Sequence, residues 1–260
     1  MMKMKHDIIV TGCSYSQKSA VGKPYPEIIN ELPNYSVTNL SWPGQSNDTI
    51  IRNVKEEIRK GTTNTLFICQ LTHLHRISKF CTINKKWLEF QPAFVNSAPT
   101  IKDNNIKFDI HIFDKKDKNS KLEIGGLGIY GAEEKNDVNL TTEMSERLLL
   151  WYQEYLVFMY DEEHEFYELH HKIDELSKQV KDSGNDILYL YWPDINFDNS
   201  LFEKNNFLKI DNDYSMLKWS VINNYTQFED SHLSLIGHYK LAEQIQLHLE
   251  NKSSIKIPFL

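Results

Sequence analysis

A serine stands directly after an apolar run near the amino-terminal end of the chain. Residues 8–10 are Ile-Ile-Val, which is typical of a strand buried on both faces of a parallel sheet. Gly12 follows where the chain must turn, and Ser14 comes two residues later. Open α/β sheets bind ligands at the carboxyl ends of their strands, so this position suits a nucleophile. A serine hydroxyl needs a base within hydrogen-bond reach before it can attack.

The carboxyl-terminal part of the chain offers such a base. His232 is preceded by the acidic residues Glu229 and Asp230, and a helical pattern begins at Ser234. A carboxylate beside a histidine can hold the imidazole in the tautomer that accepts the serine proton. The candidate catalytic residues are therefore Ser14, His232 and one of the two acids. Asp230 is favoured because its shorter side chain holds the ring more rigidly, and Glu229 is the alternative.

Two short blocks resemble the SGNH (GDSL-type) hydrolase family. Residues 12–16, Gly-Cys-Ser-Tyr-Ser, resemble the Gly-Asp-Ser-x-Ser block of that family, and residues 230–238 resemble its terminal acid-and-histidine block. The blocks stand in the family's order at opposite ends of the chain. The resemblance implies a three-layer α/β/α sandwich with a parallel, flavodoxin-like sheet, and no cofactor or metal. The family's acid stands three residues before the histidine, which is the position of Glu229.

The resemblance also implies donors for the oxyanion that forms during acyl transfer. Ser14 and Gly44 match the residues that give their backbone N–H groups. Cys13 stands where the family has aspartate, and the family's Gly-x-Asn-Asp block, whose asparagine is a further donor, is not recognisable. Three side chains near its expected position can donate instead: Gln70, Thr72 and Asn47. Thr72 is favoured by its place at the end of a strand, whereas Asn47 is better interpreted as a helix cap.

The elements that must position these residues alternate between strand and helix. Strands are predicted at residues 8–10, 35–40, 65–69 and 186–193, and helices at residues 25–32, 49–58 and 234–251. The β-α-β-α-β order of the first part favours a parallel sheet with right-handed crossovers. Ser14, Gly44 and the segment 70–72 then meet at one edge of the sheet.

Residues 78–183 interrupt this pattern, and we interpret them as an insertion within a single domain that spans residues 1–260. Short aromatic-bearing runs, such as residues 87–90 and 106–113, are separated by polar turns, a pattern that allows a hairpin within the insertion. Apolar residues at helical spacing between 141 and 183 predict one long helix, or two helices that meet near residues 161–164. A chain of 260 residues is long enough to bury one sizeable core.

Composition limits the partners of the protein. The chain has 29 Lys and Arg against 36 Asp and Glu, a net charge of −7, which argues against nucleic acid or an anionic membrane as a partner. The three cysteines lack the spacing of a disulfide framework, and no long apolar segment precedes the first strand, so we expect a cytoplasmic protein. The sequence contains no run of about 18 apolar residues, so it predicts no membrane span. The richness in Lys, Asn and Ile is typical of AT-rich genomes, including viral ones.

Three further patterns are interpreted as structural. Residues 126–131 fit Gly-x-Gly-x-x-Gly, yet the residues that follow lack the apolar face of a dinucleotide-binding helix. Glu168 and His171 have the Glu-x-x-His spacing of a di-metal bundle, but no second such helix is recognisable. His73 and His75 lack a third ligand at a spacing that would suit zinc.

The candidate residues predict acyl transfer through a covalent ester on Ser14, with His232 as the base. The resemblance implies hydrolysis of small or carbohydrate O-acyl esters, with acetyl esters as the first candidates. Two alternatives stay open. An O-acyltransferase would use the same residues, and a non-catalytic module that binds a glycan or a protein would use the same fold. The missing asparagine block favours the binding module, and the sequence does not predict an oligomeric state.

Overall fold

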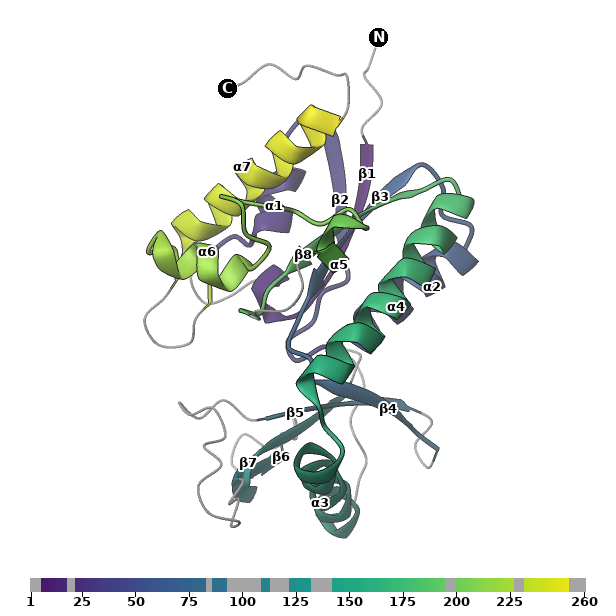
Figure 1. The fold of residues 1–260 in the computed structure, drawn as a ribbon, viewed down its shortest axis with the longest axis vertical. Coiled ribbons are helices and arrows are strands. Elements are labelled where there is room, and N and C mark those ends of the chain that lie inside the picture. Colours follow the sequence, from purple (N-terminus) through teal and green to yellow (C-terminus); the bar gives the residue numbers. More distant parts are fainter. Residues whose placement is uncertain are drawn as a thin grey trace.

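The computed structural model describes residues 6–17, 22–82, 86–92, 109–112, 122–131, 142–194, 200–226 and 232–252. These residues form two sheets. Figure 1 shows a parallel sheet between helices in the upper part of the molecule and a second sheet with one helix below it.

The parallel sheet has four strands. They are β1 (His6–Thr11), β2 (Tyr35–Asn39), β3 (Thr65–Leu71) and β8 (Asp186–Tyr191), in the spatial order β2-β1-β3-β8. All three neighbouring pairs are parallel, so the carboxyl ends of the four strands lie at one edge. The predicted strands are confirmed to within two residues.

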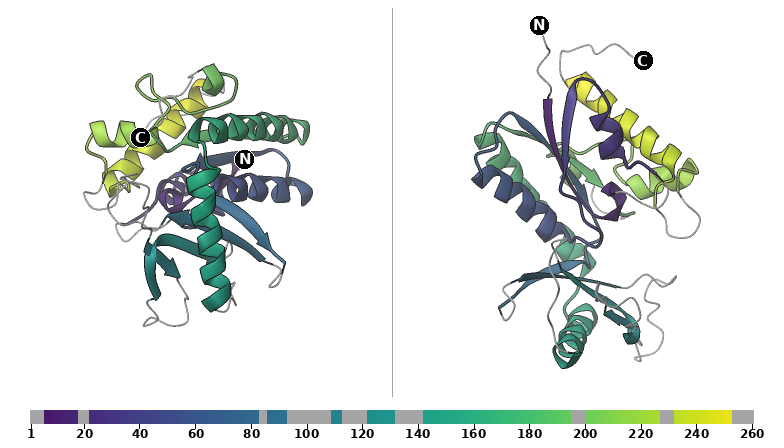
Figure 2. Two further views of the ribbon diagram at one scale, coloured as in Figure 1. Left: turned by 60° about the horizontal axis from the view of Figure 1, so that its bottom comes forward. Right: turned by 180° about the vertical axis from the view of Figure 1, so that it is seen from behind.

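Helices cover both faces of this sheet. On one face lie α1 (Tyr25–Asn30), α6 (Met216–Ile222) and α7 (Leu235–Lys252); on the other lie α2 (Asn47–Arg59), α4 (Glu162–Asp182) and the short α5 (Ser200–Glu203). The view from behind in Figure 2 shows the same two helical layers. The predicted three-layer α/β/α sandwich is confirmed. Among the helices in the described part of the chain, none has the length and apolar character that crossing a membrane requires.

The two faces of β3 carry different side chains because successive residues of a strand point to opposite sides. Phe67, Cys69 and Leu71 are buried against α2 and α4. Ile68 is buried on the opposite side, in the core formed with α1 and α7. Gln70 lies on the same side of β3 as Ile68. Its side chain therefore lies beside Gly12, in the segment that follows β1.

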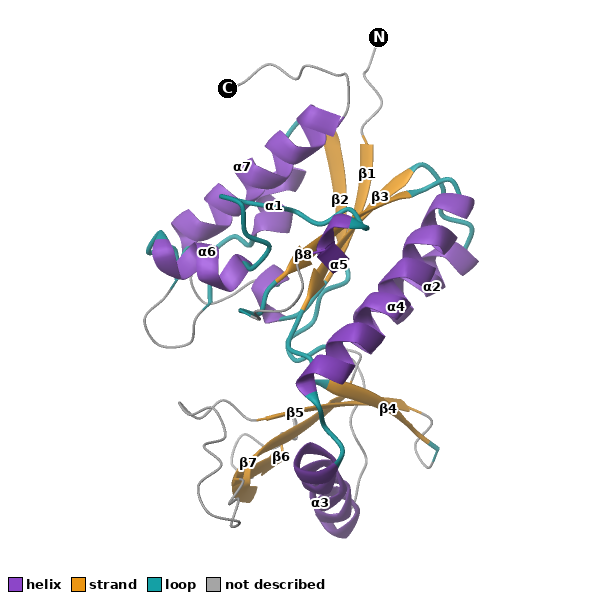
Figure 3. Cartoon of the chain, viewed as in Figure 1, coloured by secondary structure: helices purple, strands orange, loops and turns teal. Residues whose placement is uncertain are grey.

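The second sheet is built from β4 (Ile77–Cys81), β5 (Lys86–Pro92), β7 (Leu122–Gly131) and β6 (Asp109–Ile112), in that spatial order. β4 and β5 form an antiparallel hairpin, and β7 pairs antiparallel with β5 and parallel with β6. Figure 3 shows α3 (Thr142–Phe158) beside this sheet, which lies beyond the carboxyl ends of the parallel strands. The Gly-x-Gly-x-x-Gly pattern falls within β7, away from any turn between a strand and a helix.

The boundary of the predicted insertion needs correction. The apolar pattern between residues 141 and 183 forms two helices, α3 and α4, which are separated by residues 159–161. Phe166, Ile173 and Val180 of α4 are buried against β3 and β8, so α4 belongs to the sandwich and not to the insertion. A parallel strand must be reached by a crossover, and α4 supplies the helix of the crossover into β8. The insertion predicted for residues 78–183 is therefore too long at its carboxyl-terminal end.

Candidate active site

Ser14 and His232 meet at the carboxyl edge of the parallel sheet. Ser14 begins a short 3-10 helix (Ser14–Ser16) after β1, and His232 lies just before α7. The Nε2 atom of His232 is 2.8 Å from Ser14 Oγ, although 218 positions separate the two residues in the chain. Both residues are partly exposed, so a small molecule can reach them. This geometry is the one that a serine nucleophile and its base require.

The turn that carries Ser14 is packed tightly against β3. A Cβ atom added to Gly12 would lie 2.8 Å from Gln70 Cβ and 2.8 Å from Ser16 Oγ, closer than side chains can approach. Gly12 does not have a positive φ. The sequence therefore needs glycine here because of the close approach of the two segments, and not because of an unusual backbone conformation.

Two hydrogen bonds of Ser234 hold the segment that carries His232 at the start of α7. The backbone N–H of Ser234 donates to Tyr225 O at 2.6 Å. The side chain of Ser234 accepts a hydrogen bond from Gly237 N–H at 3.1 Å and so caps the helix. A Cβ atom at Gly237 would lie 2.5 Å from Tyr225 O, so only glycine permits this approach.

Two aromatic rings lie beside the histidine. The ring of Tyr15 lies 4.5 Å from the imidazole of His232, measured between centroids, and it stacks on Trp192 at 3.7 Å. Trp192 follows directly after β8, at the same edge of the sheet. The two rings support one side of the imidazole. The sequence analysis did not predict this contact. The signals that could have indicated it are the aromatic residue next to Ser14 and the tryptophan at the end of a predicted strand.

Gly44 lies in the loop after β2, with a φ of 82° that favours glycine. Hydrogen bonds tie this loop to the nucleophile turn. Trp42 N–H donates to Gly12 O at 3.1 Å, and Asn39 Nδ2 donates to Ser16 O at 2.8 Å. The structure thus brings the segment of Gly44 next to the turn of Ser14. That their backbone N–H groups bind an oxyanion stays a prediction.

The Gln70 side chain is buried and hydrogen-bonded within the protein. Its Oε1 atom accepts hydrogen bonds from the backbone N–H of Cys13 at 3.2 Å and from Ser16 Oγ at 3.2 Å. Its Nε2 atom donates to Leu71 O at 2.8 Å. Both the oxygen and the nitrogen of this amide are hydrogen-bonded within the protein, which argues against the prediction that Gln70 donates to the oxyanion.

Asn47 and Thr72 are also directed elsewhere. The side-chain amide of Asn47 pairs with the backbone of Thr72: Oδ1 accepts from Thr72 N–H at 2.8 Å, and Nδ2 donates to Thr72 O at 3.0 Å. The helix cap is Ser46, which corrects the prediction that Asn47 caps α2. Thr72 is fully buried, and its hydroxyl has no hydrogen-bond partner among the described residues. Burial of both side chains argues against their predicted role as oxyanion donors.

The two candidate acids, Glu229 and Asp230, lie outside the described residues. Their role beside His232 stays a prediction. His238, in the first turn of α7, is buried, and burial lowers its pKa to about 4. His238 is the last residue of the block 230–238, but the sequence alone predicted no role for it.

His73 and His75 follow β3 and stack on each other, with ring centroids 5.2 Å apart. Burial, and then the charge of Arg76, lowers the pKa of His73 to about 3. Burial also lowers the pKa of His75 well below its ordinary value. Within the described ranges, no three His, Cys, Asp or Glu side chains come together as a metal site would need.

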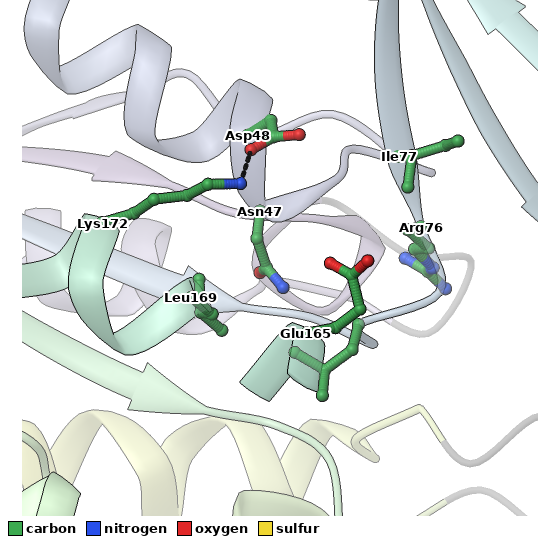
Figure 4. Close-up of a pocket in the computed structure, with 8 residues that line it drawn as sticks. Asn47, Asp48, Arg76, Ile77, Glu165, Leu169 and Lys172 are labelled. Carbon is green, nitrogen blue, oxygen red and sulfur yellow. Dashed lines mark hydrogen bonds and ion pairs between the residues drawn. The ribbon is translucent and has the colours of Figure 1, made fainter. Parts of the chain in front are cut away.

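A small cavity of about 30 Å³ lies on the face of the parallel sheet that α2 and α4 cover, between these helices and the start of β4. Figure 4 shows Asn47, Arg76 and Glu165 around it, with an ion pair of 2.9 Å between Lys172 and Asp48 at one side. Neither residue of the serine–histidine pair lines this cavity. Its volume suits a water molecule and not a substrate.

The fold and site together define an α/β sandwich that carries a serine and a histidine at the carboxyl edge of its parallel sheet. No protein-family model matches the sequence, and a search of curated proteins returns no match. Among solved structures, the chain is similar to the protein YxiM of Bacillus subtilis, with 12% identity, a TM-score of 0.46, and coverage of 96% of this chain and 57% of that one. It thus spans little more than half of the length of YxiM. It is also similar to a putative lipolytic protein of the G-D-S-L family from Desulfitobacterium hafniense DCB-2, with 8% identity, a TM-score of 0.44, and coverage of 94% and 99% of the two chains.

Proposed function

We propose that the protein hydrolyses small or carbohydrate O-acyl esters through a covalent acyl-enzyme on Ser14. The observation that carries this proposal is the distance of 2.8 Å between Ser14 Oγ and His232 Nε2. A serine becomes a useful nucleophile when a base at this distance can take its proton. The ester substrate class comes from the resemblance of two sequence blocks to the SGNH hydrolases.

The reaction would proceed in two halves. Ser14 Oγ attacks the ester carbonyl carbon while His232 Nε2 takes the hydroxyl proton, and the backbone N–H groups of Ser14 and Gly44 bind the oxyanion. The bond to the alcohol then breaks, and His232 returns the proton to the leaving oxygen. Water attacks the acyl-enzyme with His232 again as base, which releases the acid and restores the serine. Asp230 or Glu229 would orient the imidazole throughout.

The first prediction tests the nucleophile. Ser14→Ala should lower kcat/KM for p-nitrophenyl acetate by at least about 10³-fold, because the proposed mechanism forms the acyl-enzyme on the Ser14 hydroxyl. It should also abolish labelling by a fluorophosphonate probe, which reacts only with an activated serine. Ser14 is partly exposed and contributes little packing, so the melting temperature should stay close to that of the wild type.

Ser183→Ala is the matched control. Ser183 lies at the end of α4, before β8 begins, and therefore at the opposite edge of the parallel sheet. It should keep full labelling and turnover. Turnover that survives in Ser14→Ala would remove the nucleophile assignment. A folded wild type that is neither labelled nor active would favour the non-catalytic binding module over the hydrolase.

A further inference from the structure

A chain of buried polar groups runs behind the site, from β3 to α7. Its members are almost completely inaccessible to solvent, with exposed fractions of 1% for Gln70, 0% for Ser16, 0% for Tyr25 and 2% for His238. Buried polar groups of this kind are stable only when they are hydrogen-bonded to one another. The chain connects the turn that carries Ser14 with the helix that follows His232.

The first link holds the nucleophile turn against β3. Gln70 Oε1 accepts the backbone N–H of Cys13 at 3.2 Å and the hydroxyl of Ser16 at 3.2 Å. These two residues flank Ser14 closely in the sequence. The orientation of the amide follows from its partners, because Nε2 must face a carbonyl and donates to Leu71 O at 2.8 Å.

The second link joins Ser16 to α1. Ser16 Oγ lies 2.9 Å from the hydroxyl oxygen of Tyr25. A serine hydroxyl has one hydrogen, and Ser16 gives it to Gln70, so the Tyr25 hydroxyl must be the donor in this pair. Burial raises the pKa of Tyr25, which keeps its phenol protonated and able to donate.

The third link joins α1 to α7. The backbone N–H of Tyr25 donates to His238 Nδ1 at 3.3 Å. Burial, and then the neighbouring charge of His232, lowers the pKa of His238 to about 4, so His238 is neutral at neutral pH and Nδ1 is free to accept. His238 N–H in turn donates to Ser234 O at 2.9 Å, in the first turn of the helix and two positions after His232.

We propose that His238 is a positioning residue, which accepts the Tyr25 N–H and thereby holds His232 at hydrogen-bond distance from Ser14. The two reacting groups come from opposite ends of the chain, so their distance depends on how α7 is held against the nucleophile turn. A displacement of about 1 Å between reacting groups can cost about 10²-fold in rate. This inference rests on the proposed function of the Ser14 and His232 pair.

The test compares two substitutions of one residue. His238→Asn keeps an acceptor, since the asparagine Oδ1 occupies the place of Nδ1. His238→Leu keeps the apolar volume and removes the acceptor. On p-nitrophenyl acetate, His238→Leu should lower kcat by about 10- to 100-fold with KM within about threefold, and His238→Asn should keep kcat within about threefold. Equal kinetics in the two variants would overturn the inference.

A second pair of variants separates positioning from a general loss of stability. Tyr25→Phe removes the hydroxyl that joins Ser16 to α1 and should lower kcat by about 3- to 10-fold. Tyr189→Phe is the matched control, because Tyr189 is equally buried and its hydroxyl lies 3.0 Å from Ser177 on the opposite face of the sheet. It should lose similar stability but keep kcat. If His238→Leu does not fold, His238→Ala takes its place as the variant without the acceptor, and kcat equal to that of His238→Asn overturns the inference.

An NMR readout distinguishes failure of the inference from failure of the proposed function. The ¹⁵N resonance of His232 Nε2 reports its hydrogen bond with Ser14 independently of turnover. It should move in His238→Leu and stay near the wild-type position in His238→Asn. An inactive wild type that shows this pattern would remove the proposed function and keep the positioning role. Identical His232 resonances in all variants would remove the positioning role.

Discussion

The hydroxyl of Thr72 illustrates what single buried groups contribute. It is fully buried and has no hydrogen-bond partner among the described residues. A buried hydroxyl without a partner costs free energy, on the order of 1–3 kcal/mol. We therefore predict that Thr72→Val keeps kcat within about twofold and leaves stability unchanged or slightly increased. Urea denaturation and steady-state kinetics check this, and a large fall in kcat would restore Thr72 as an oxyanion donor.

A buried histidine on the other side of the sheet predicts how stability depends on pH. His170 lies among aromatic rings, with Phe166 at 4.5 Å and Phe202 at 5.1 Å, and its ring nitrogens have no hydrogen-bond partner within the described ranges. Burial lowers its pKa from 6.5 to about 4, a larger effect than that of the nearby charges of Asp174, which opposes it, and Lys204. The unfolded chain therefore binds the proton more readily.

The sign of the effect follows from this difference in pKa. The stability that neutral His170 contributes is present above pH 6.5 and is lost as the pH falls towards 4, by at most about 3 kcal/mol. His170→Leu should flatten this part of the curve of stability against pH without abolishing it, because His238 titrates in the same range. Urea midpoints measured between pH 4 and 7 provide the measurement. A curve that keeps its full slope would contradict the prediction.

At the scale of single residues, the sequence predicted that Ser14 and His232 lie together but not where the amides point. Ser14 and His232 could be chosen because their neighbours in the chain form recognisable blocks. Gln70 was predicted as an oxyanion donor from its place at a strand end, but the direction of its side chain depends on Cys13 and Ser16, which are 57 and 54 positions away. A side-chain direction set by such distant partners cannot be read from local pattern.

At the scale of elements, one carboxylate joins the second sheet to the sandwich. Glu89 of β5 is buried and accepts the backbone N–H of Ser46 at 2.9 Å at the start of α2. It also accepts the hydroxyl of Thr49. A negative charge at a helix amino terminus is favourable, whereas burial raises the pKa of Glu89 and so disfavours the charge. Ser46 lies two residues after Gly44, so this contact supports the loop beside the nucleophile turn.

Substitutions of Glu89 should separate the hydrogen bonds from the charge. Glu89→Gln keeps an acceptor for Ser46 N–H and removes a buried charge, so the free energy of unfolding should stay within about 1 kcal/mol of the wild type. Glu89→Leu removes the acceptor and should cost about 2–4 kcal/mol. Glu175→Leu, which removes an exposed partner of Lys55, is the control and should cost less than about 1 kcal/mol. Equal losses for the two Glu89 variants in urea denaturation would contradict this interpretation.

The elements themselves were largely predictable from periodicity. The strands and helices of the sandwich have clear apolar patterns, and the structure moves their ends by only a few residues. The assignment of α4 to the insertion was wrong because periodicity shows that a helix has an apolar face but not which sheet covers it. The predicted helix cap moved from Asn47 to Ser46 because Asn47 is engaged by Thr72, a tertiary contact.

At the scale of the whole molecule, two sheets with different strand directions meet near the site. The four parallel strands end at the edge where Ser14, Gly44 and Trp192 lie, and the second sheet lies beyond this edge (Figure 1). Motif blocks predicted the first of these assemblies. For the second sheet the sequence suggested only a hairpin, because its strands carry weak alternation. Its contacts with α2 are tertiary, and include those of Glu89 with Ser46 and of Arg52 with Trp87.

The separation of 218 positions between Ser14 and His232 also has a consequence in time. Contacts between distant parts of a chain form late in folding, since the entropy of closing so long a loop must first be overcome. Until β8 and α7 have docked, Ser14 lies at the end of β1 without the imidazole of His232 beside it. The proposed esterase activity would then be one of the last properties that a refolding molecule acquires, and it would belong to the completed fold and not to any contiguous fragment.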